Sequence, residues 1–445
     1  MLKHNSVFKL ILIIFMTNTL ISQQIIETDF DKSSKEQTVK QLSALLIDKY
    51  VFPETGKKMA EFINSNLKDG KYDEIADPKQ FSQILTADLQ LISKDKHLTV
   101  SFNPKEAAQI LDASGNDEEP KELNLRIEEM KNENFGFFKV ERLEGNIGYV
   151  DFRTNYSSLE HSKETIKAVM NFISNCKAVI FDLRKNGGCY PQVVQYIESH
   201  FFNNEPIHLN DLYYREGNRT ESFWTLKDIE GKRMPEVPLY ILTGKNTFSG
   251  AEEFAYDMKN LKRAVIVGES TGGGANPGQF LAINKDFVTF LPTGRAINPI
   301  TGTNWEGNGV KPDIEVKSEN ALNKAHSMAI QTLAEKSADE IERSMYEWIS
   351  DALVASENPP SADANKLKSY TGTYEDRTIT FEDGRLFYQR KDRPKLEMTL
   401  LAEDTFMFKD AEFFRLKFLR DGNGKITGLT GIYENGQKDI SMKKE

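Results

Sequence analysis

The hydrophobic positions of the first part of the chain follow a helical period. From about residue 35 to 95, apolar residues recur in groups that each fit one helix face: Leu42, Leu45 and Leu46, then Met59, Phe62 and Ile63, then Phe81, Ile84, Leu85 and Leu89. This spacing predicts a small N-terminal helical domain over residues 25–104.

Short apolar runs alternate with amphipathic stretches between about residues 145 and 318. The runs IGYVDF, AVIFDL, PLYIL and AVIVG each have the length of a strand, and the stretch after the first carries Ile166, Val169, Met170 and Ile173 at helical spacing. Strands and helices in alternation imply βαβ units. We therefore expect an α/β core over residues 145–345.

Two polar stretches are interpreted as linkers. Residues 105–144 contain the charged run DASGNDEEPKELNLRIEEMKNEN, and residues 346–366 contain SENPPSADANK. The remaining stretch, 367–445, alternates polar and apolar positions, interrupted by Asp383-Gly384, Asp421-Gly422 and Asn435-Gly436. Such pairs are hairpin signals, so this stretch is expected to form a small antiparallel β domain.

Composition and the N-terminus restrict the compartment and the partners. The formal charge is −10 and the chain has no basic stripe, which argues against a nucleic acid partner. Lys3 and Lys9 flank the apolar run LILIIF, a pattern that predicts a signal peptide over residues 1–22 and an exported, periplasmic or extracellular protein. No later segment approaches the roughly 20 apolar residues of a spanning helix, so no stable membrane insertion is expected.

The cysteines and one glycine-rich loop are weak candidates for chemistry. Cys176 and Cys189 are the only cysteines, and free thiols are favoured over a bridge. A Cys189 nucleophile is the alternative, but no histidine or carboxylate lies near it in sequence to activate it. The loop GESTGGGANPG, residues 268–278, lacks the Lys-Ser/Thr of a nucleotide-binding loop. We expect no cofactor and no metal ion.

Ser249, in the segment NTFSGAEEF, allows two interpretations. Its spacing from Glu252 is that of a capping box at the start of a helix. It also follows the apolar run PLYIL through a short loop, which would place its hydroxyl at the C-terminal edge of the sheet, where open α/β sheets bind ligands. A cap and a nucleophile are compatible roles in such a turn, and both interpretations remain open.

A serine nucleophile needs a base and donors for the oxyanion. Gly187 and Gly188 follow the run AVIF, where backbone N–H groups at a strand end can form an oxyanion hole or merely a tight turn. His97 lies at the exit of a helix, with Asp95 two residues before it. His161 and His200 fall within amphipathic helices and are interpreted as surface or packing residues.

Four ordered segments carry a family resemblance. DLRKNGG, TFSGAEEFAYDMKN, AVIVGESTGGG and WEGNGVKPDIEV together resemble the C-terminal processing (tail-specific) serine peptidases over roughly residues 35–320. The resemblance implies a ClpP/crotonase-like α/β core and a serine endopeptidase that acts on peptides or unfolded proteins, with Ser249 as nucleophile. One branch of the family uses a lysine base, and here Gly274 stands at that position.

The other branch is similar to the tricorn core protease and to the modules of interphotoreceptor retinoid-binding protein. By this resemblance His97 is the base, Glu306 the glutamate of the constellation, and the amides of Gly188 and Gly250 the oxyanion hole. The tricorn type has a serine directly before its histidine, whereas this chain has Lys96.

Two further features follow from this comparison. Residues 98–146 are too few for the PDZ domain that many members insert there, and the C-terminal domain resembles small lipocalin-like barrels of bacterial exported hydrolases. The retinoid-binding relatives use this architecture to hold apolar ligands. The alternative function is therefore a catalytically silent module that binds an apolar ligand or a peptide.

Overall fold

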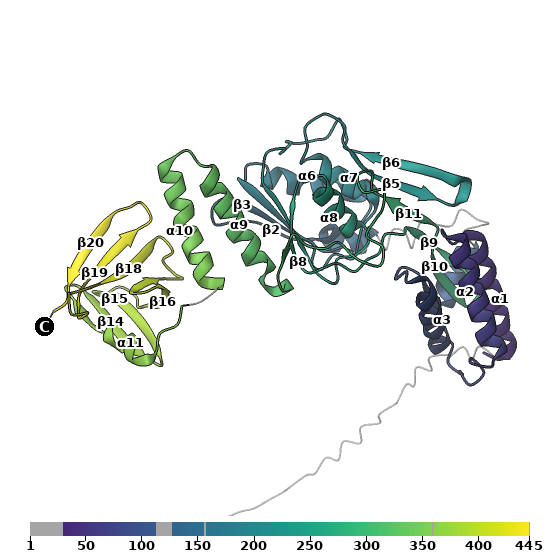
Figure 1. Cartoon of the computed structure of the whole chain (residues 1–445), viewed down its shortest axis with the longest axis horizontal. Helices are drawn as coiled ribbons and strands as arrows, with labels where there is room; N and C mark the ends of the chain where they lie inside the picture. Colours follow the sequence, from purple (N-terminus) through teal and green to yellow (C-terminus); the bar gives the residue numbers. More distant parts are fainter. Residues whose placement is uncertain (1–29, 113–126, 155–156, 358–359, 445) are drawn as a thin grey trace, which may run out of the picture.

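The computed structural model describes residues 30–112, 127–154, 157–357 and 360–444. The chain forms a helical unit, an α/β core and a C-terminal β unit, in the order of the sequence (Figure 1). The signal peptide expected over residues 1–22 lies outside the described residues. No helix within the described ranges is long and apolar enough to cross a membrane.

The helical unit consists of α1 (Lys32–Lys49), α2 (Pro53–Lys68) and α3 (Pro78–Ser93). Asp31 and Asp77 cap α1 and α3 by accepting backbone N–H groups, and proline begins α2 and α3, where its missing N–H costs nothing. The apolar faces meet in one core that confirms the expected helices: it includes Leu42, Leu46, Met59, Ile63, Phe81, Leu85 and Leu89.

A three-stranded sheet joins the helical unit to the core. β1 (Thr99–Phe102) pairs antiparallel with β10 (Phe287–Pro292), which pairs with β9 (Gly278–Ala282). Phe287 and Leu291 of β10 are buried in the helical core. Thr99, at the start of β1, lies opposite Phe290 of β10. The shared core and this pairing therefore hold the residues just before β1 against the α/β unit.

The α/β core is built on a six-stranded sheet with the order β12-β8-β7-β4-β3-β2. All neighbouring strands are parallel except the β2–β3 pair. The strands are β2 (Phe137–Leu143), β3 (Ile147–Phe152), β4 (Ala178–Asp182), β7 (Leu239–Thr243), β8 (Val265–Gly268) and β12 (Ile314–Glu315). A smaller sheet contains β11 (Gly294–Ile297), β5 (His208–Tyr214) and β6 (Arg219–Trp224).

Helices cover both faces of the main sheet (Figure 1). Val179 and Phe181 of β4 pack with α6 (Leu159–Ile173), α7 (Pro191–Ser199) and α8 (Gly250–Asn260). Ala178 and Ile180 pack on the other face with α9 (Ala321–Lys336) and α10 (Glu340–Glu357). Burial of alternate residues on opposite faces explains the continuous apolar runs and confirms the α/β core.

The two expected linkers contain regular structure. Residues 105–144 include nearly all of α4 (Pro104–Asp112) and β2, which forms an edge of the main sheet, and the part from 113 to 126 lies outside the described residues. Residues 346–366 include the last two thirds of α10, where Tyr346 and Ile349 are buried. In the described parts of these segments the apolar positions that pack are few and are separated by charged residues, so the sequence pattern does not reveal them.

The C-terminal unit follows α11 (Ala364–Ser369) and is an antiparallel sheet whose strands are paired in sequence order. The bridge between Tyr374 and Lys443 brings the first and last strands together, so the sheet nearly closes into a barrel. Asp383 and Gly384 both have positive φ in the second hairpin, as expected. The strands are β13 (Gly372–Tyr374), β14 (Arg377–Glu382), β15 (Arg385–Arg390), β16 (Leu396–Ala402), β17 (Thr405–Met407), β18 (Phe414–Arg420), β19 (Ile426–Tyr433) and β20 (Lys438–Met442).

Candidate active site

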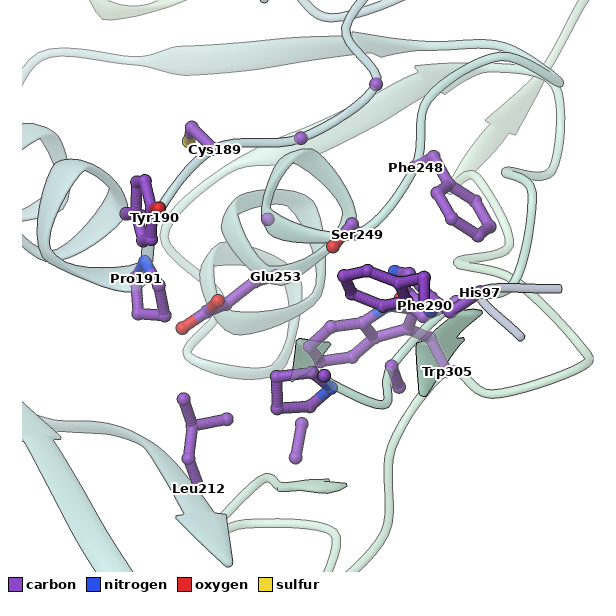
Figure 2. Close-up of a pocket in the computed structure, with 18 of the residues that line it drawn as sticks. His97, Cys189, Tyr190, Pro191, Leu212, Phe248, Ser249, Glu253, Phe290 and Trp305 are labelled. Atoms are coloured by element: carbon purple, nitrogen blue, oxygen red, sulfur yellow. The ribbon is translucent and has the colours of Figure 1, made fainter. Parts of the chain in front are cut away.

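Ser249 lies between β7 and α8, at the N-cap of the helix, with φ 53° and ψ −125°. This conformation is strained for a residue other than glycine and is typical of functional turns. The Glu252 carboxylate accepts the backbone N–H of Ser249 at 3.0 Å, which is one half of the expected capping box. The turn thus holds the Ser249 hydroxyl toward the adjoining cavity (Figure 2).

Glu252 also organises the glycine-rich loop that follows β8. Its carboxylate accepts the N–H groups of Gly273 and Gly274 at 2.7 and 2.8 Å, and the hydroxyl of Thr271. The glycine N–H groups that a phosphate would need are therefore bound to a carboxylate of the protein. The loop serves to position the start of α8 and the cavity wall.

The glycine loop after β4 lies directly beside the Ser249 turn, because β4 and β7 are neighbouring parallel strands. The Phe248 N–H donates to the Asn186 carbonyl oxygen at 3.0 Å, which ties the two loops together. Gly188 has φ +123°, and a Cβ there would lie only 2.8 Å from Ser249 Cβ. Only glycine permits this close approach.

The two expected oxyanion donors differ in their hydrogen bonding. The Gly188 N–H donates to Asn186 Oδ1 at 2.9 Å, whereas the Gly250 N–H makes no hydrogen bond with any described residue. Asn186 is a site residue that the sequence interpretation missed. Its signal is its position two residues before Gly188, since asparagine side chains commonly accept the backbone N–H two residues later.

A cavity of about 560 Å³ opens beside Ser249. It brings together four of the five residues that the sequence analysis selected, from elements far apart in the chain. These lining residues are His97, Gly188, Ser249 and Gly250. The fifth, Glu306, lies behind the His97 ring and is not part of the cavity wall.

His97 is held between two aromatic rings, with centroid distances of 4.5 Å to Phe248 and 5.9 Å to Phe290 (Figure 2). Neither ring nitrogen has a hydrogen-bond partner among the described residues. Burial lowers the pKa of His97 to about 4. The imidazole is therefore neutral near pH 7, the form that can accept a proton.

Two carboxyl groups face the imidazole from behind. Asp95 Oδ1 accepts the backbone N–H of His97 at 3.0 Å and lies 3.9 Å from Nδ1. Glu306 accepts the Ala275 N–H at 2.6 Å through Oε2, and its Oε1 has no partner among the described residues. Asp95, His97 and Glu306 each place a donor atom within 4.8 Å of the others, the one such potential metal-binding group in the described parts of the chain.

The ionisation of this group follows from its burial. Desolvation and the nearby Asp95 charge raise the pKa of Glu306 to about 8, and desolvation also raises the pKa of Asp95. Tyr50 and Asn276 each donate a hydrogen bond to Asp95 Oδ2, at 3.2 and 2.9 Å. These donors favour the ionised form of Asp95, so Glu306 is the carboxyl group that holds a proton near neutral pH.

Lys96, which stands where the tricorn type has a serine, is used structurally. Its Nζ donates to the Gly272 carbonyl oxygen at 2.5 Å and thereby fastens the His97 loop to the glycine-rich loop. Cys176 and Cys189 are both free thiols, as expected. Burial raises the pKa of the Cys189 thiol, which opposes the thiolate that a cysteine nucleophile requires.

Comparison of the sequence with known protein families identifies the family of this chain. Residues 146–316 match Peptidase family S41, and residues 23–141 match the N-terminal domain of Peptidase_S41 in eukaryotic IRBP. The chain belongs to peptidase family S41. The resemblance seen in the four motifs is thus confirmed, and this S41 member is a serine peptidase whose substrates are peptides or proteins.

Solved structures similar to this S41 chain include three proteins of low identity. A Parabacteroides merdae protein described as a peptidase is 19% identical, with 66% of this chain and 96% of that chain covered and a TM-score of 0.47. The photosystem II D1 C-terminal processing protease is 14% identical, with coverages of 64% and 94% and a TM-score of 0.41. The tricorn protease is 14% identical, with coverages of 65% and 35% and a TM-score of 0.39.

Proposed function

We propose that this S41 peptidase is an exported endopeptidase that cleaves peptide bonds through Ser249, His97 and Glu306 and a covalent acyl-enzyme. The observation that carries the proposal is that the strained Ser249 turn and the unpartnered ring of His97 line one cavity. A serine becomes a useful nucleophile only when a base takes its proton, and His97 is the neutral base available there.

The reaction has two steps, acylation of Ser249 and hydrolysis of the acyl-enzyme, and His97 accepts and returns one proton in each. His97 accepts the hydroxyl proton as Ser249 Oγ attacks the scissile carbonyl carbon, and then gives that proton to the leaving amine, which departs and leaves an ester on Ser249. In the second step, water gives a proton to His97 as its oxygen attacks the ester carbonyl carbon, and the ester bond then breaks as His97 returns that proton to the Ser249 oxygen, which releases the acid product and restores the serine and the neutral imidazole.

Backbone N–H groups stabilise the tetrahedral oxyanion. The Gly250 N–H is free to donate, and it belongs to the first turn of α8, where the helix dipole favours negative charge. The Gly188 N–H contributes if it leaves Asn186 when substrate binds. Loss of one such donor typically costs about 100-fold to 1,000-fold in kcat.

The carboxyl groups behind His97 support the imidazolium that forms transiently. Because burial disfavours a charged ring, the imidazolium needs a negative neighbour in the same low-dielectric region. Asp95 supplies that charge, and Glu306 adds a second negative charge when it loses its proton to solvent as the pH rises above its raised pKa. Neither carboxyl group is hydrogen-bonded to the resting imidazole, so a small closure on substrate binding would complete the arrangement.

Export is the second part of the proposal and rests on the pattern of residues 1–22. The test is mass spectrometry of the N-terminus of the protein recovered from the exported fraction of producing cells. A chain that begins near Gln23 supports export, and a chain that retains residues 1–22 inside the cell contradicts it.

Peptides released from casein or a synthetic peptide library, identified by mass spectrometry, test the catalytic proposal. The wild-type protein is expected to release internal fragments, and Ser249→Ala and His97→Ala to release none. Equal release by a folded Ser249→Ala protein would exclude the mechanism. Absence of turnover in the wild type, combined with binding of apolar ligands, would instead favour the silent binding module.

A further inference from the structure

Glu253 lies one helical turn after Ser249 on the same face of α8. Residues four apart on a helix are neighbours, about 6 Å apart along the axis. Both residues line the cavity, and Figure 2 shows the Glu253 carboxylate directed into the space that begins at Ser249. The Glu253 carboxyl group is thus separated from Ser249 by about the length of one long side chain.

The Glu253 carboxylate has few hydrogen-bond partners in the described parts of the protein. The residue is only 6% exposed, and its one hydrogen bond comes from Asn210 Nδ2, 3.2 Å from Oε1. Its second oxygen accepts no hydrogen bond from a described residue, and no described lysine, arginine or histidine forms an ion pair with it. A buried carboxylate without a cationic partner is costly to the folded chain.

Two more buried acids, Glu198 and Asp257, interact electrostatically with Glu253. Glu198 of α7 is fully buried with both carboxyl oxygens unpartnered, and Asp257 of α8 is fully buried with Oδ2 unpartnered, among the groups the structure describes. Burial raises the pKa of all three acids, that of Glu253 to about 7. Their donor atoms do not converge on a common metal position.

The walls between Ser249 and Glu253 are largely apolar. The apolar side chains that line this cavity include Pro191, Leu212, Ala296 and Trp305. A side chain with a long apolar stem and a cationic end can pack its stem against the apolar walls and pair its charge with the Glu253 carboxylate. The extended lysine side chain spans roughly 6 Å from Cα to Nζ, which matches the separation along α8.

We propose that this cavity receives the substrate side chain on the acyl side of the scissile bond, and that Glu253 makes it selective for lysine or arginine. The inference rests on the proposed function, because Ser249 must be the nucleophile for the cavity to hold that side chain. The bound ammonium or guanidinium pairs with the Glu253 carboxylate and keeps it ionised. Neutral side chains of the same length leave the acid unpaired and bind less well.

Matched peptides test the selectivity. Blocked peptides that differ only in lysine or norleucine at the cleaved position have the same length and differ in charge. We expect wild-type kcat/KM to favour lysine by about tenfold or more at pH 8, and Glu253→Gln to reduce this ratio by about tenfold. The control is Glu221→Gln in β6, which lies away from the cavity wall and should keep the wild-type ratio.

A wild-type enzyme that prefers norleucine, or a Glu253→Gln variant that keeps the lysine preference, would overturn the assignment. Cleavage after neutral residues with the expected Ser249 dependence would overturn it while leaving the proposed function intact.

Binding measured without turnover separates the two proposals. Calorimetry on Ser249→Ala protein should show benzamidine, a cation, binding about tenfold or more tighter than neutral benzamide, and Glu253→Gln in the same background should remove the difference. Equal binding of the two compounds would overturn the cation pocket. Benzamidine selectivity that depends on Glu253, in a chain that cleaves no peptide, would support the pocket and refute the peptidase mechanism.

Discussion

The His97 ring packs against the ring of Phe248, with the centroids 4.5 Å apart, and Phe248 immediately precedes Ser249. The proposed base is therefore positioned by the residue adjacent to the proposed nucleophile. Gly274 completes this contact from the loop side: a Cβ there would overlap Phe248 and lie 2.6 Å from His97 Cε1.

Gly274→Ala should displace the His97 and Phe248 rings and lower kcat/KM by about 100-fold or more, because a misplacement of about 1 Å is costly in a catalytic site. Steady-state kinetics on blocked peptides measures the loss. Gly422→Ala, in the β unit, has nothing within 4 Å of the added Cβ and serves as the control. Near-wild-type activity of Gly274→Ala would show that the ring contact does not position the base.

Replacement of Ser249 should separate catalysis from folding. Both Ser249→Ala and Ser249→Gly remove the nucleophile and should reduce kcat by about 10,000-fold or more. Because φ is 53° at this position, glycine relieves strain that alanine retains, so the glycine variant should be more stable than the alanine variant by about 1 kcal/mol. Urea denaturation of the two variants measures this difference, and a less stable glycine variant would argue against backbone strain.

The pH dependence of kcat/KM should reflect the buried imidazole. The pKa of His97 is lowered to about 4, so the neutral base persists below the ordinary value of 6.5 and is lost as pH falls through the folded pKa. With blocked peptides that do not titrate, the acidic limb should lie below pH 6.5. A limb at pH 7 or above would indicate that a neighbouring carboxylate holds the imidazole charged in the resting enzyme.

Glu306 should make the folded state less stable as the pH rises. Its folded pKa, raised to about 8, exceeds the ordinary 4.5, so the folded state binds more protons in this window and the Glu306 contribution is lost as pH rises from 4.5 to 8. Glu306→Gln removes that loss, so its Tm relative to wild type should be a few degrees higher at pH 8 than at pH 5. Glu319→Gln, at an exposed site, is the control, and the same relative Tm at both pH values would contradict the assignment.

The lysines near Ser249 in sequence should be dispensable. The Lys245 side chain is 82% exposed and its Nζ lies 3.6 Å from Glu269, and neither Lys245 nor Lys262 lines the cavity. Lys245→Ala and Lys262→Ala should therefore retain kcat within about threefold, because a base must lie within hydrogen-bond reach of the Ser249 hydroxyl and neither lysine lines the cavity that contains it. Loss of activity in either variant at wild-type stability would replace the histidine mechanism with a lysine base.

The sequence determined the elements and the local turns of this protein. Apolar residues at helical spacing identified the three helices around Leu46, Met59 and Phe81, and four apolar runs identified four of the six strands of the main sheet, because both patterns depend only on neighbours along the chain. The Asp383-Gly384 hairpin was likewise readable, since positive φ is a local requirement. The charged segments that contain β2 and α10 were not, because their burial depends on distant partners.

The site required tertiary structure. The register of β1 on β10 brings His97 to the cavity, and the loop that carries Glu306, more than 200 residues later in the chain, reaches the same ring. Sequence alone names these residues by family resemblance but cannot bring them together, since strand pairing between distant segments is set by the shared core. The environment of Glu253 is the clearest case: its sequence position marks a helix residue, and only the tertiary structure shows that its carboxylate contacts Asn210 and the cavity and has no cationic partner in the described parts of the chain.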